Sequence, residues 1–344
     1  MESFKTFFIK IRKEIHRVPR NVLKNLKKLT KALHPLLPKF LKRKYLNFIE
    51  RIVVISGQNC SLKCKHCANF SPYLAKIIPF YPYEEICQDI AELTKHTQIK
   101  TLQFQGGEFF LHPNATQILQ YTAQNPRIHR IIIATNATIV PKDSLLRIIK
   151  ESGKITLRLS NYGIVNMKGI QRLESALKEW EIPYYSHHFV HQQDTWVDCG
   201  NVKMARLKDK IVQKIFKECI FGKECLTMEN GFISKCSRAT IAHLVQNFAL
   251  SKDCGLLINP KTQRAFSAFT PLEIGGGGGV KLPELPEFNF ENLQNFLSAQ
   301  TPLQACYYCY GTSGQEIPAG VQLSKEELSN LTQAKFYTLN FSLP

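Results

Sequence analysis

Between residues 51 and 185 the sequence alternates short apolar runs with longer amphipathic segments. The predicted strands cover residues 51–56, 100–105, 130–135, 155–160 and, with a weaker pattern, 182–185. The predicted helices repeat apolar residues at helical spacing and cover residues 83–96, 114–125, 141–152 and 170–180. This alternation predicts parallel βα units, and strands that are apolar on both sides predict a sheet or barrel covered by helices. We therefore expect an α/β fold.

The length and composition predict a folded protein with more than one domain. The chain has 344 residues, of which 44% are hydrophobic, enough for one large domain and a smaller one. Eleven cysteines could indicate a disulfide scaffold, but the charged start of the chain lacks the apolar stretch of a signal peptide. No apolar run is long enough to span a membrane. We therefore expect a cytoplasmic protein whose cysteines bind metal.

Positive charge is concentrated near the N-terminus. The first 51 residues contain 15 Lys or Arg against three Glu, which accounts for +12 of the net charge of +18. Phe4, Phe8, Ile11 and Ile15 recur at helical spacing, so residues 1–49 are predicted to be a basic amphipathic helical extension. It either lies on an anionic membrane surface, at the inner face of the membrane, or packs its apolar stripe on the protein body. No nucleic acid is expected, because no RNA-binding or helix-turn-helix pattern accompanies the charge.

The loop after the first predicted strand carries three cysteines, Cys60, Cys64 and Cys67. In α/β folds, active sites lie beyond the carboxyl ends of the strands. Three cysteines from one loop can hold an iron-sulfur cluster with one iron left open for another molecule, whereas a zinc ion needs a fourth ligand from elsewhere. The loop therefore predicts a metal centre at the end of the sheet.

The spacing of these cysteines, with three and then two residues between them, resembles the cluster loop of the radical S-adenosylmethionine (SAM) enzymes. The second predicted strand ends in Gly106, Gly107 and Glu108, followed by the letters FFLHPN. This stretch resembles the Gly-Gly-Glu segment of the same superfamily.

The third predicted strand ends in Thr135 and Asn136, which is similar to the Thr-Asn-Gly segment of the superfamily, although Ala137 stands in place of the glycine. The three motifs occur in family order, at the ends of three successive strands, and the resemblance covers about residues 50–190 closely. It implies a partial (β/α)6 TIM-like barrel.

The resemblance also implies a cofactor site. The three loop cysteines would bind three irons of a [4Fe-4S] cluster, and the fourth iron would take the amino and carboxylate groups of SAM. The Gly-Gly-Glu segment would bind the SAM amino group, because glycines let the backbone approach closely. Thr135 and Asn136 would belong to the same site, and Ser160 would reach the ribose hydroxyls. An electron from the cluster would cleave SAM to a 5′-deoxyadenosyl radical.

Arg158 lies two residues before Ser160, and therefore on the same face of the fourth predicted strand. Either this polar face lines a barrel lumen, with Arg158 a candidate catalytic residue, or Arg158 pairs with a carboxylate at the rim. His66 is expected to be a packing or adenine-side residue, since a fourth ligand would close the cluster to SAM. Further candidates for a base or a substrate contact have no motif behind them and could equally lie on the surface. They are His187, His188, His191 and Asp194.

A second set of cysteines follows residue 215. Its members are Cys219, Cys236, Cys306 and Cys309. Their arrangement resembles the shortened SPASM domain called twitch, known from 2-deoxy-scyllo-inosamine dehydrogenase, and implies an auxiliary [4Fe-4S] cluster. A four-cysteine zinc site is the alternative, because the ligand set alone does not identify the metal. Cys225 is close enough in sequence to replace Cys219, and Cys199 and Cys254 have no assigned role.

These features predict four segments. They are a basic helical extension (1–49), a radical SAM core (50–215), a small α+β auxiliary cluster domain (216–315) and a C-terminal tail (316–344). The five consecutive glycines at 275–279 predict a loop. Ser324, followed three residues later by Glu327, predicts the start of a helix in the tail.

The function expected from a radical and a second cluster is a two-electron oxidation of a sugar, a cyclitol, a glycan precursor or a related polar metabolite. A flavodoxin or ferredoxin-type protein would donate the electrons. The alternative is a maturase that modifies a peptide or protein, although the extension shows no strand pattern for a winged-helix recognition domain. A non-catalytic zinc or iron-sulfur protein is the remote alternative, since it would leave the open iron without a purpose.

Overall fold

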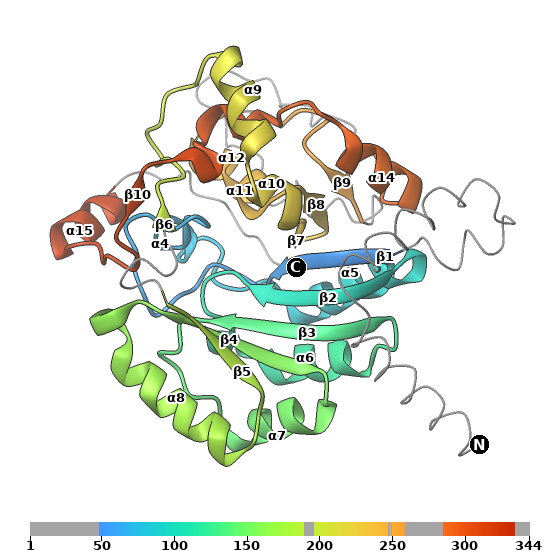
Figure 1. The fold of residues 1–344 in the computed structure, drawn as a ribbon, viewed down its shortest axis with the longest axis vertical. Coiled ribbons are helices and arrows are strands. Elements are labelled where there is room, and N and C mark those ends of the chain that lie inside the picture. The colour runs from blue at the N-terminus through green and yellow to red at the C-terminus, as the bar shows by residue number, and fades with distance from the viewer. Residues whose placement is uncertain (1–47, 189–195, 247, 249, 259–284, 334–344) are drawn as a thin grey trace, which may run out of the picture. The chain divides into compact units, whose positions relative to one another are not determined.

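The computed structural model describes residues 48–188, 196–246, 248, 250–258 and 285–333 (Figure 1). The predicted basic extension, apart from its last two residues, lies outside the described residues, as do His191, Asp194 and the run of five glycines. The described residues from Phe48 onward belong to one compact unit.

An eight-stranded sheet organises the described part of the chain, in the order β5-β4-β3-β2-β1-β7-β8-β9. The five predicted strands are all present, and neighbours among them pair in parallel. They are β1 (Phe48–Ile55), β2 (Gln98–Gln105), β3 (Ile128–Thr135), β4 (Ile155–Asn161) and β5 (Tyr184–His188). The prediction of parallel βα units is confirmed.

Each of the first four strands is connected to the next through a helix, and these four helices cover one face of the sheet (Figure 1). They are α5 (Tyr83–His96), α6 (Ala115–Gln124), α7 (Asp143–Ser152) and α8 (Met167–Glu179). Apolar residues at helical spacing put Ile90, Leu119 and Leu173 on the inner faces of α5, α6 and α8, where each is 0% exposed. Burial of these stripes stabilises the helices against the sheet.

The sheet has one apolar face and one partly polar face. Ile52, Leu102 and Ile133 are fully buried in the core, whereas Gln103 and Arg158, whose side chains leave the opposite face, line a cavity. A parallel sheet with helices on one face and a side-chain-lined interior on the other is the arrangement of a partial TIM-like barrel. The predicted fold class is therefore confirmed.

The sixth parallel strand, β7 (Thr227–Glu229), pairs with β1 and not with β5. It continues through Asn230 and Gly231 into β8 (Phe232–Ser234), which pairs with β9 (Leu256–Leu257). Asn230 and Gly231 have φ angles of 48° and 76°, as a two-residue hairpin turn requires. Through this hairpin, one continuous sheet extends from the predicted core into the segment predicted as the auxiliary domain.

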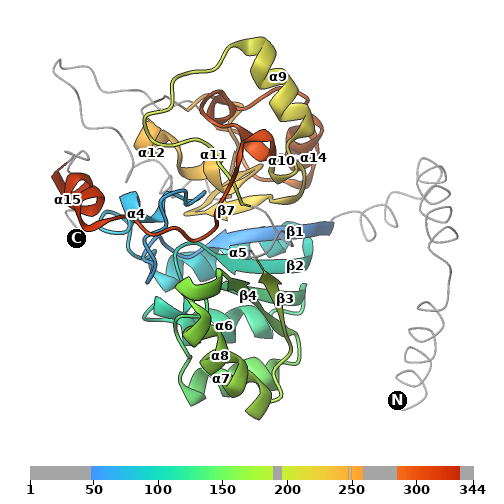
Figure 2. The same cartoon turned by 60° about the vertical axis from the view of Figure 1, so that its left-hand side comes forward.

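The remaining elements are short, and most follow β5. They are α4 (Ser71–Leu74), η2 (Phe109–Leu111), η3 (Gly163–Val165), β6 (Trp196–Val197), α9 (Asp209–Glu218), α10 (Phe221–Glu224), α11 (Ser237–Ile241), α12 (His243–Gln246), α14 (Phe290–Ser298), η4 (Gln304–Tyr308), η5 (Gly311–Ser313), β10 (Glu316–Ile317) and α15 (Lys325–Gln333). Figure 2 shows α9 to α14 gathered beyond β1 and β7, on the other side from α6 to α8. The predicted boundary at 215/216 falls inside α9, and the four predicted segments remain predictions.

The segment predicted as a tail returns to the cysteine loop. Gln322 forms an isolated β-bridge with Cys64, and the backbone N–H of Leu323 donates to the carbonyl oxygen of Lys63 at 2.8 Å. The strand β10 that precedes this segment pairs with β6. Residues 316–333 are therefore part of the wall around the cysteine loop.

The helix predicted in the tail is confirmed as α15. The Ser324 hydroxyl accepts from the backbone N–H of Glu327 at 3.0 Å, and the Glu327 carboxylate accepts from the backbone N–H of Ser324 at 2.8 Å. These reciprocal bonds satisfy two backbone donors at the helix start. Among the helices of the described residues, none combines the length and apolar character needed to cross a bilayer.

Candidate active site between two cysteine sets

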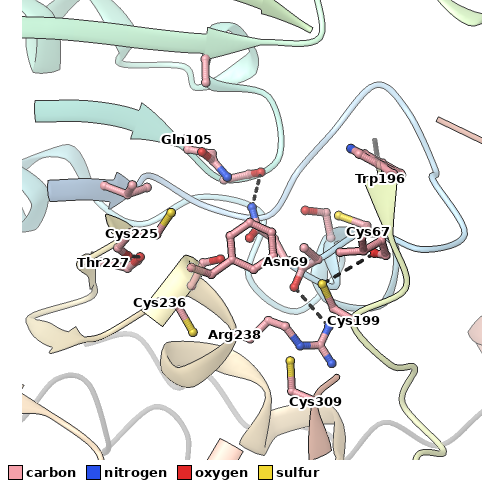
Figure 3. Close-up of a pocket in the computed structure, with 18 of the residues that line it drawn as sticks. Cys67, Asn69, Gln105, Trp196, Cys199, Cys225, Thr227, Cys236, Arg238 and Cys309 are labelled. Carbon is pink, nitrogen blue, oxygen red and sulfur yellow. Dashed lines mark hydrogen bonds between the residues drawn. The ribbon is translucent and has the colours of Figure 1, made fainter. Parts of the chain in front are cut away.

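A cavity of about 360 Å³ lies beside the carboxyl ends of the parallel strands (Figure 3). Nine of the eleven cysteines line it. They are Cys60, Cys64, Cys67, Cys199, Cys219, Cys225, Cys236, Cys306 and Cys309. The residues that line it include Arg51, Arg158, Lys235 and Arg238, and no Asp or Glu of the described chain is among them. Both predicted cysteine sets therefore face one space with a basic wall.

The cysteine loop directly follows β1, and two amide side chains point at its sulfur atoms. Asn136 Nδ2 donates to Cys60 Sγ at 3.4 Å, and Gln322 Nε2 donates to Cys64 Sγ at 3.3 Å. Burial raises the pKa of the Cys60 thiol to about 12 and that of Cys64 to about 11. Metal binding must therefore displace these protons, and the two amides can then stabilise the resulting thiolates.

The three loop cysteines can together hold a cluster. Each of Cys64 and Cys67 raises the pKa of Cys60 through its charge, which places the three thiols near one another. A [4Fe-4S] cluster is larger than an ion and joins thiolates that stand farther apart. Three thiols, two of them with amide donors, fit such a cluster.

Gly106 and Gly107 allow the end of β2 to pack against the start of the cysteine loop. The Gly107 N–H donates to the carbonyl oxygen of Gly57 at 2.9 Å, and the carbonyl oxygen of Gly106 accepts from Asn69 Nδ2 at 3.1 Å. A Cβ on Gly107 would lie 2.0 Å from the carbonyl oxygen of Asn59. Both glycines line the cavity, so the structure gives them a packing role, and their contact with SAM remains a prediction.

Glu108 holds the end of β3 in place. Its buried carboxylate accepts from the Thr135 hydroxyl at 2.9 Å and from the backbone N–H of Asn136 at 2.8 Å. Burial raises the pKa of Glu108 to about 7, although these donors lower it. Thr135 and Asn136 line the cavity and Glu108 does not. Glu108 therefore positions the amide that reaches Cys60.

Ala137 adopts a backbone conformation that favours glycine. Its φ is 59°, in the left-handed region that costs a residue with a Cβ about 1–2 kcal/mol. The preceding carbonyl, that of Asn136, accepts from Asn166 Nδ2 at 2.6 Å, and Thr138 donates from its hydroxyl to Asn136 Oδ1 at 2.7 Å. This turn explains why the superfamily motif has a glycine where this chain has Ala137.

Arg158 and Ser160 both line the cavity, on the inner face of β4. The Nε atom of Arg158 is buried without a hydrogen-bond partner, and no carboxylate of the described residues forms an ion pair with it. Of the two placements expected for Arg158, the structure has the one inside the barrel. His187 and His188 belong to β5 and do not line the cavity.

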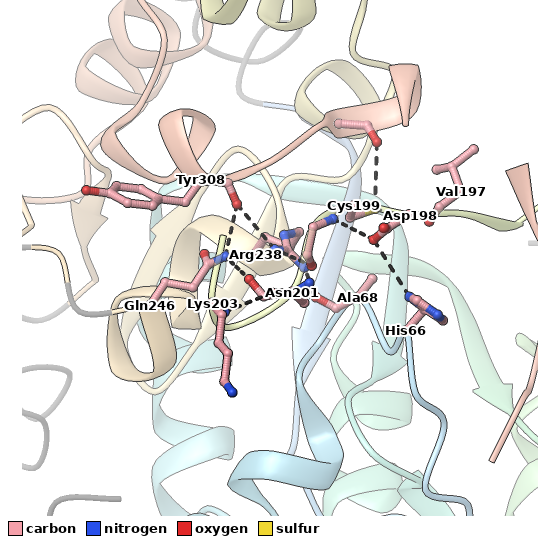
Figure 4. A network of polar contacts seen from close by, with 12 residues as sticks. His66, Ala68, Val197, Asp198, Cys199, Asn201, Lys203, Arg238, Gln246 and Tyr308 are labelled. Atoms are coloured by element: carbon pink, nitrogen blue, oxygen red, sulfur yellow. Dashed lines mark hydrogen bonds and ion pairs between the residues drawn. The ribbon is translucent and has the colours of Figure 1, made fainter. Parts of the chain in front are cut away.

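His66 lies on the cavity wall and faces the segment after β6. Its Nδ1 is 3.8 Å from Asp198 Oδ1, and the same carboxylate oxygen accepts from the backbone N–H of Gly200 at 2.8 Å (Figure 4). These contacts match the expected packing role. The only signal for Asp198 in the sequence is its position next to Cys199, and that signal is weak.

The second cysteine set assembles from α9, α11 and η4. The charges of Cys306, Cys309 and Cys219 each raise the pKa of Cys236, so the four thiols predicted as ligands are close together. The Cys309 sulfur accepts from the N–H of Gly311 at 3.2 Å. The contact with the Cys199 thiol is the largest cause that lowers the pKa of Cys309, whereas burial raises the pKa of Cys236 and raises that of Cys306 to about 12. Metal binding must therefore displace protons from this set as well.

Cys225 and Cys254 differ in their relation to this second set. Burial raises the pKa of Cys225, and the charges of Arg51, Arg158 and Cys219 also act on it, so Cys225 lies near Cys219 on the cavity wall. The charge of Cys219 acts on Cys236 as well, and the choice of Cys219 as the ligand remains a prediction. Cys254 is buried in a small apolar cluster away from the cavity.

Arg238 joins the loops of the two cysteine sets (Figure 4). It follows Cys236 by two residues, and its guanidinium donates to the carbonyl oxygens of Gly200 at 3.1 Å and of Ala68 at 3.5 Å. Its Nε atom is buried without a partner. Sequence patterns gave no signal for Arg238 or for Gln322, because both act through contacts with residues far away along the chain.

Comparison with known proteins identifies the family of the segment that carries the first cysteine set. Residues 54–162 match the family model described as the radical SAM superfamily. This segment contains the cysteine loop, the Gly-Gly-Glu segment and β4. It is a radical SAM domain, and radical SAM enzymes use a [4Fe-4S] cluster and SAM.

One curated protein and two solved structures are also similar to parts of the chain. A stretch of 102 residues is 29% identical to the antilisterial bacteriocin subtilosin biosynthesis protein AlbA of Bacillus subtilis (strain 168), over 29% of this chain and 21% of AlbA. This chain thus spans about a fifth of that relative. A search of solved structures found BtrN in complex with AdoMet and 2-DOIA, at 15% identity and a TM-score of 0.42, over 80% of this chain and 98% of BtrN. It also found SuiB of Streptococcus suis bound to S-adenosylmethionine, at 19% identity and a TM-score of 0.35, over 52% of this chain and 39% of SuiB.

Proposed function

We propose that this protein cleaves SAM reductively and uses the 5′-deoxyadenosyl radical to remove a hydrogen atom from its substrate, a sugar, cyclitol or related polar metabolite, in a two-electron oxidation. The observation that carries the proposal is that both cysteine sets line one cavity. Cys60, Cys64 and Cys67 would hold a cluster that can supply the electron for SAM cleavage. The second set would hold a cluster that can accept the electron that the substrate loses, with a proton, after the hydrogen atom has been removed.

The residues around the first cysteine set would orient the ligand thiolates and bind SAM. Asn136 and Gln322 donate to Cys60 and Cys64 and hold these thiolates in place. Asn136, Thr135 and Ser160 lie on the cavity wall, where we assign them to SAM. Tyr162, two residues after Ser160, is half-buried, and the centre of its ring lies 5.4 Å from that of Trp196. Both rings line the cavity.

An iron count tests the two-cluster part of the proposal. Protein reconstituted anaerobically should hold about eight irons per chain, because each cluster contributes four. The Cys236→Ala/Cys306→Ala double variant should keep about four irons and its SAM-dependent chemistry, whereas Cys254→Ala, a buried cysteine outside the cavity, should keep all eight. Zinc in place of the second four irons would contradict an electron acceptor at this site.

A peptide or protein maturase is the second candidate function. The similarity to a segment of AlbA, whose name refers to biosynthesis of a bacteriocin, favours this candidate. Deuterium transfer distinguishes the two. The protein is incubated with SAM and dithionite in the presence of either the small-molecule or the peptide fraction from cells grown on deuterated medium. Deuterium in 5′-deoxyadenosine with the small-molecule fraction alone supports the oxidation of a metabolite, and transfer from the peptide fraction alone contradicts it.

We also propose two partners outside the cavity. A flavodoxin or ferredoxin-type protein would donate the electron, and the basic residues of the segment 1–49 would bind an anionic membrane surface, each contributing on the order of 1 kcal/mol. Sedimentation with neutral and anionic vesicles tests the second. The intact chain should pellet with anionic vesicles at low salt, and a chain lacking residues 2–47 should not. An intact chain that stays in the supernatant would contradict membrane binding.

A further inference from the structure

Two arginines face the cavity from different strands of the sheet. Arg51 belongs to β1 and Arg158 to β4, and both are among the residues that line the cavity. The charge of Arg51 contributes to lowering the pKa of Arg158, after burial, the largest cause. The two guanidinium groups are therefore close enough to repel each other across the interior.

Neither arginine is balanced by the protein. Arg51 donates from a terminal nitrogen to Gln103 Oε1, and the Nε atoms of both arginines are buried without a hydrogen-bond partner. No carboxylate in the described ranges forms an ion pair with either, and none lines the cavity. Both side chains are half-buried, with their Nε atoms fully enclosed, and charges of one sign that face the same cavity are unfavourable unless an opposite charge pairs with them. An anion in the cavity would supply that opposite charge.

The other groups nearby do not supply that anion. The Cys225 thiol lies beside both arginines, but burial raises its pKa, so it is a neutral thiol at pH 7. The remaining two cations of the wall are bound by backbone carbonyl oxygens. Lys235 Nζ donates to Ala299 at 2.7 Å, and the Arg238 guanidinium donates to Gly200 at 3.1 Å and to Ala68 at 3.5 Å. Arg51 and Arg158 are left over.

We propose that Arg51 and Arg158 bind an oxyanion of the substrate, a carboxylate or a phosphate. A guanidinium offers parallel N–H donors that match the two oxygens of such a group, and a water-poor cavity strengthens the bond. This proposal rests on the proposed function, because it takes the cavity to be the substrate site. It narrows the substrate from a polar metabolite to one with an acidic group.

The depth of Arg51 favours the substrate over the carboxylate of SAM. Arg51 lies four residues before Ile55, the end of β1 that leads into the cysteine loop. At about 3.3 Å per residue its Cα lies about 13 Å below that end. Its partner Gln103 is likewise two residues below the end of β2. Arg158 stands higher, because it pairs with Ala134, which the register places level with Gln105 and Ile55. The cluster and the amino-acid part of SAM would belong to the cysteine loop beyond the strand ends, so Arg51, the deeper of the two arginines, is the one whose position favours the substrate.

Calorimetry with inorganic phosphate and with malonate tests the proposal on the reconstituted holoprotein. Arg51→Gln and Arg158→Gln should each weaken binding about tenfold, since each removes one charge-assisted contact. The control is Arg172→Gln, an exposed arginine of α8, which should bind the anions as the wild type does. Saturating SAM should leave the phosphate affinity unchanged. Equal binding by wild type and the two variants, including no binding by any of them, would overturn the proposal.

A measurement on the wild type alone tests the proposal even if the variants fail to fold. Phenylglyoxal modifies accessible arginines, and peptide mass spectrometry identifies them. Phosphate should protect Arg51 and Arg158 at least about tenfold and leave Arg172 unprotected, whereas SAM without phosphate should not protect the pair. Protection by SAM, or competition between SAM and phosphate, would assign the pair to the SAM carboxylate and overturn the proposal. Release of 5′-deoxyadenosine by the same preparation is scored separately, because its absence contradicts the proposed function and not the anion site.

Discussion

The guanidinium of Arg238 lies 4.2 Å from the centre of the Phe70 ring. Phe70 ends the cysteine loop in a left-handed conformation, with a φ of 56°, and Arg238 stands in the first turn of α11, two residues after Cys236. Because the same guanidinium also donates to carbonyl oxygens on both sides, it fixes the loop of one cysteine set against that of the other.

Replacing Arg238 should therefore loosen both sets together. Arg238→Met keeps most of the apolar volume but removes the contact with Phe70 and leaves buried carbonyl oxygens without a donor, so we expect a loss of about 3 kcal/mol in the free energy of unfolding. Arg238→Lys should lose less, because the charge remains. Urea unfolding and an iron count on both variants measure this, and a stable Arg238→Met protein with full iron would contradict the role.

Gly107 should tolerate no side chain. In Gly107→Ala the new Cβ would lie 2.0 Å from the carbonyl oxygen of Asn59, whereas a Cβ at Gly222 meets open space. We expect Gly107→Ala to lose at least about 2 kcal/mol in the free energy of unfolding and much of the iron of the first set. Gly222→Ala is the matched control and should stay near the wild type. Equal melting temperatures for the two variants would contradict this prediction, because they would show that the backbone at Asn59 can move away from the added Cβ.

Gln322 should raise the reduction potential of the first cluster. Its Nε2 donates to Cys64 Sγ, and hydrogen bonds to ligand sulfurs favour the reduced, more negative state. In Gln322→Leu we expect the potential to fall by on the order of tens of mV, measured by redox titration followed by electron paramagnetic resonance. Val321→Ala, which changes the neighbouring, partly exposed residue, serves as the control. An unchanged potential in Gln322→Leu would mean that the amide leaves the sulfur once the cluster is bound.

Glu229 should make the protein less stable as the pH rises. Burial raises its pKa to about 7 in the folded state, above the value of an unfolded glutamate, so only the folded state holds the proton between about pH 4.5 and pH 7. Its contribution is present at low pH and is lost as the pH rises through this window. Between pH 5.5 and pH 8 the free energy of unfolding should fall about 2 kcal/mol less in Glu229→Gln than in the wild type.

Urea unfolding at both pH values measures this difference. Glu179→Gln, at an exposed position of α8, should behave as the wild type does. Identical pH dependence in Glu229→Gln and the wild type would show that Glu229 is ionised in the folded protein.

Local pattern was enough to predict the parallel strands and most of the cavity wall. The runs that became β1 to β4 carry their own β-branched signal, whereas β5 has only its aromatic residues. The motifs that follow these strands bring Cys60, Asn136 and Ser160 to one place through the geometry of a parallel sheet. The capping pair of Ser324 and Glu327 was equally local.

Other features depended on contacts that no local pattern encodes. The strand β7 has only three residues, so its Asn-Gly turn was the one signal for the hairpin, and its pairing with β1 joins residues more than 170 positions apart. Gln322 reaches Cys64 across 258 positions. That Arg51 and Arg158 line one cavity likewise appears only when the strands are assembled into the sheet.

The release of 5′-deoxyadenosine tests the central claim most directly. The anaerobically reconstituted protein is mixed with dithionite and SAM, and 5′-deoxyadenosine and methionine are quantified over time by mass spectrometry. We predict slow release of both in equal amounts without any substrate, and none from the Cys60→Ala/Cys64→Ala/Cys67→Ala variant. If the iron-loaded wild type forms neither product, or if the triple variant forms both at the wild-type rate, the assignment of radical chemistry to the cysteine loop is wrong.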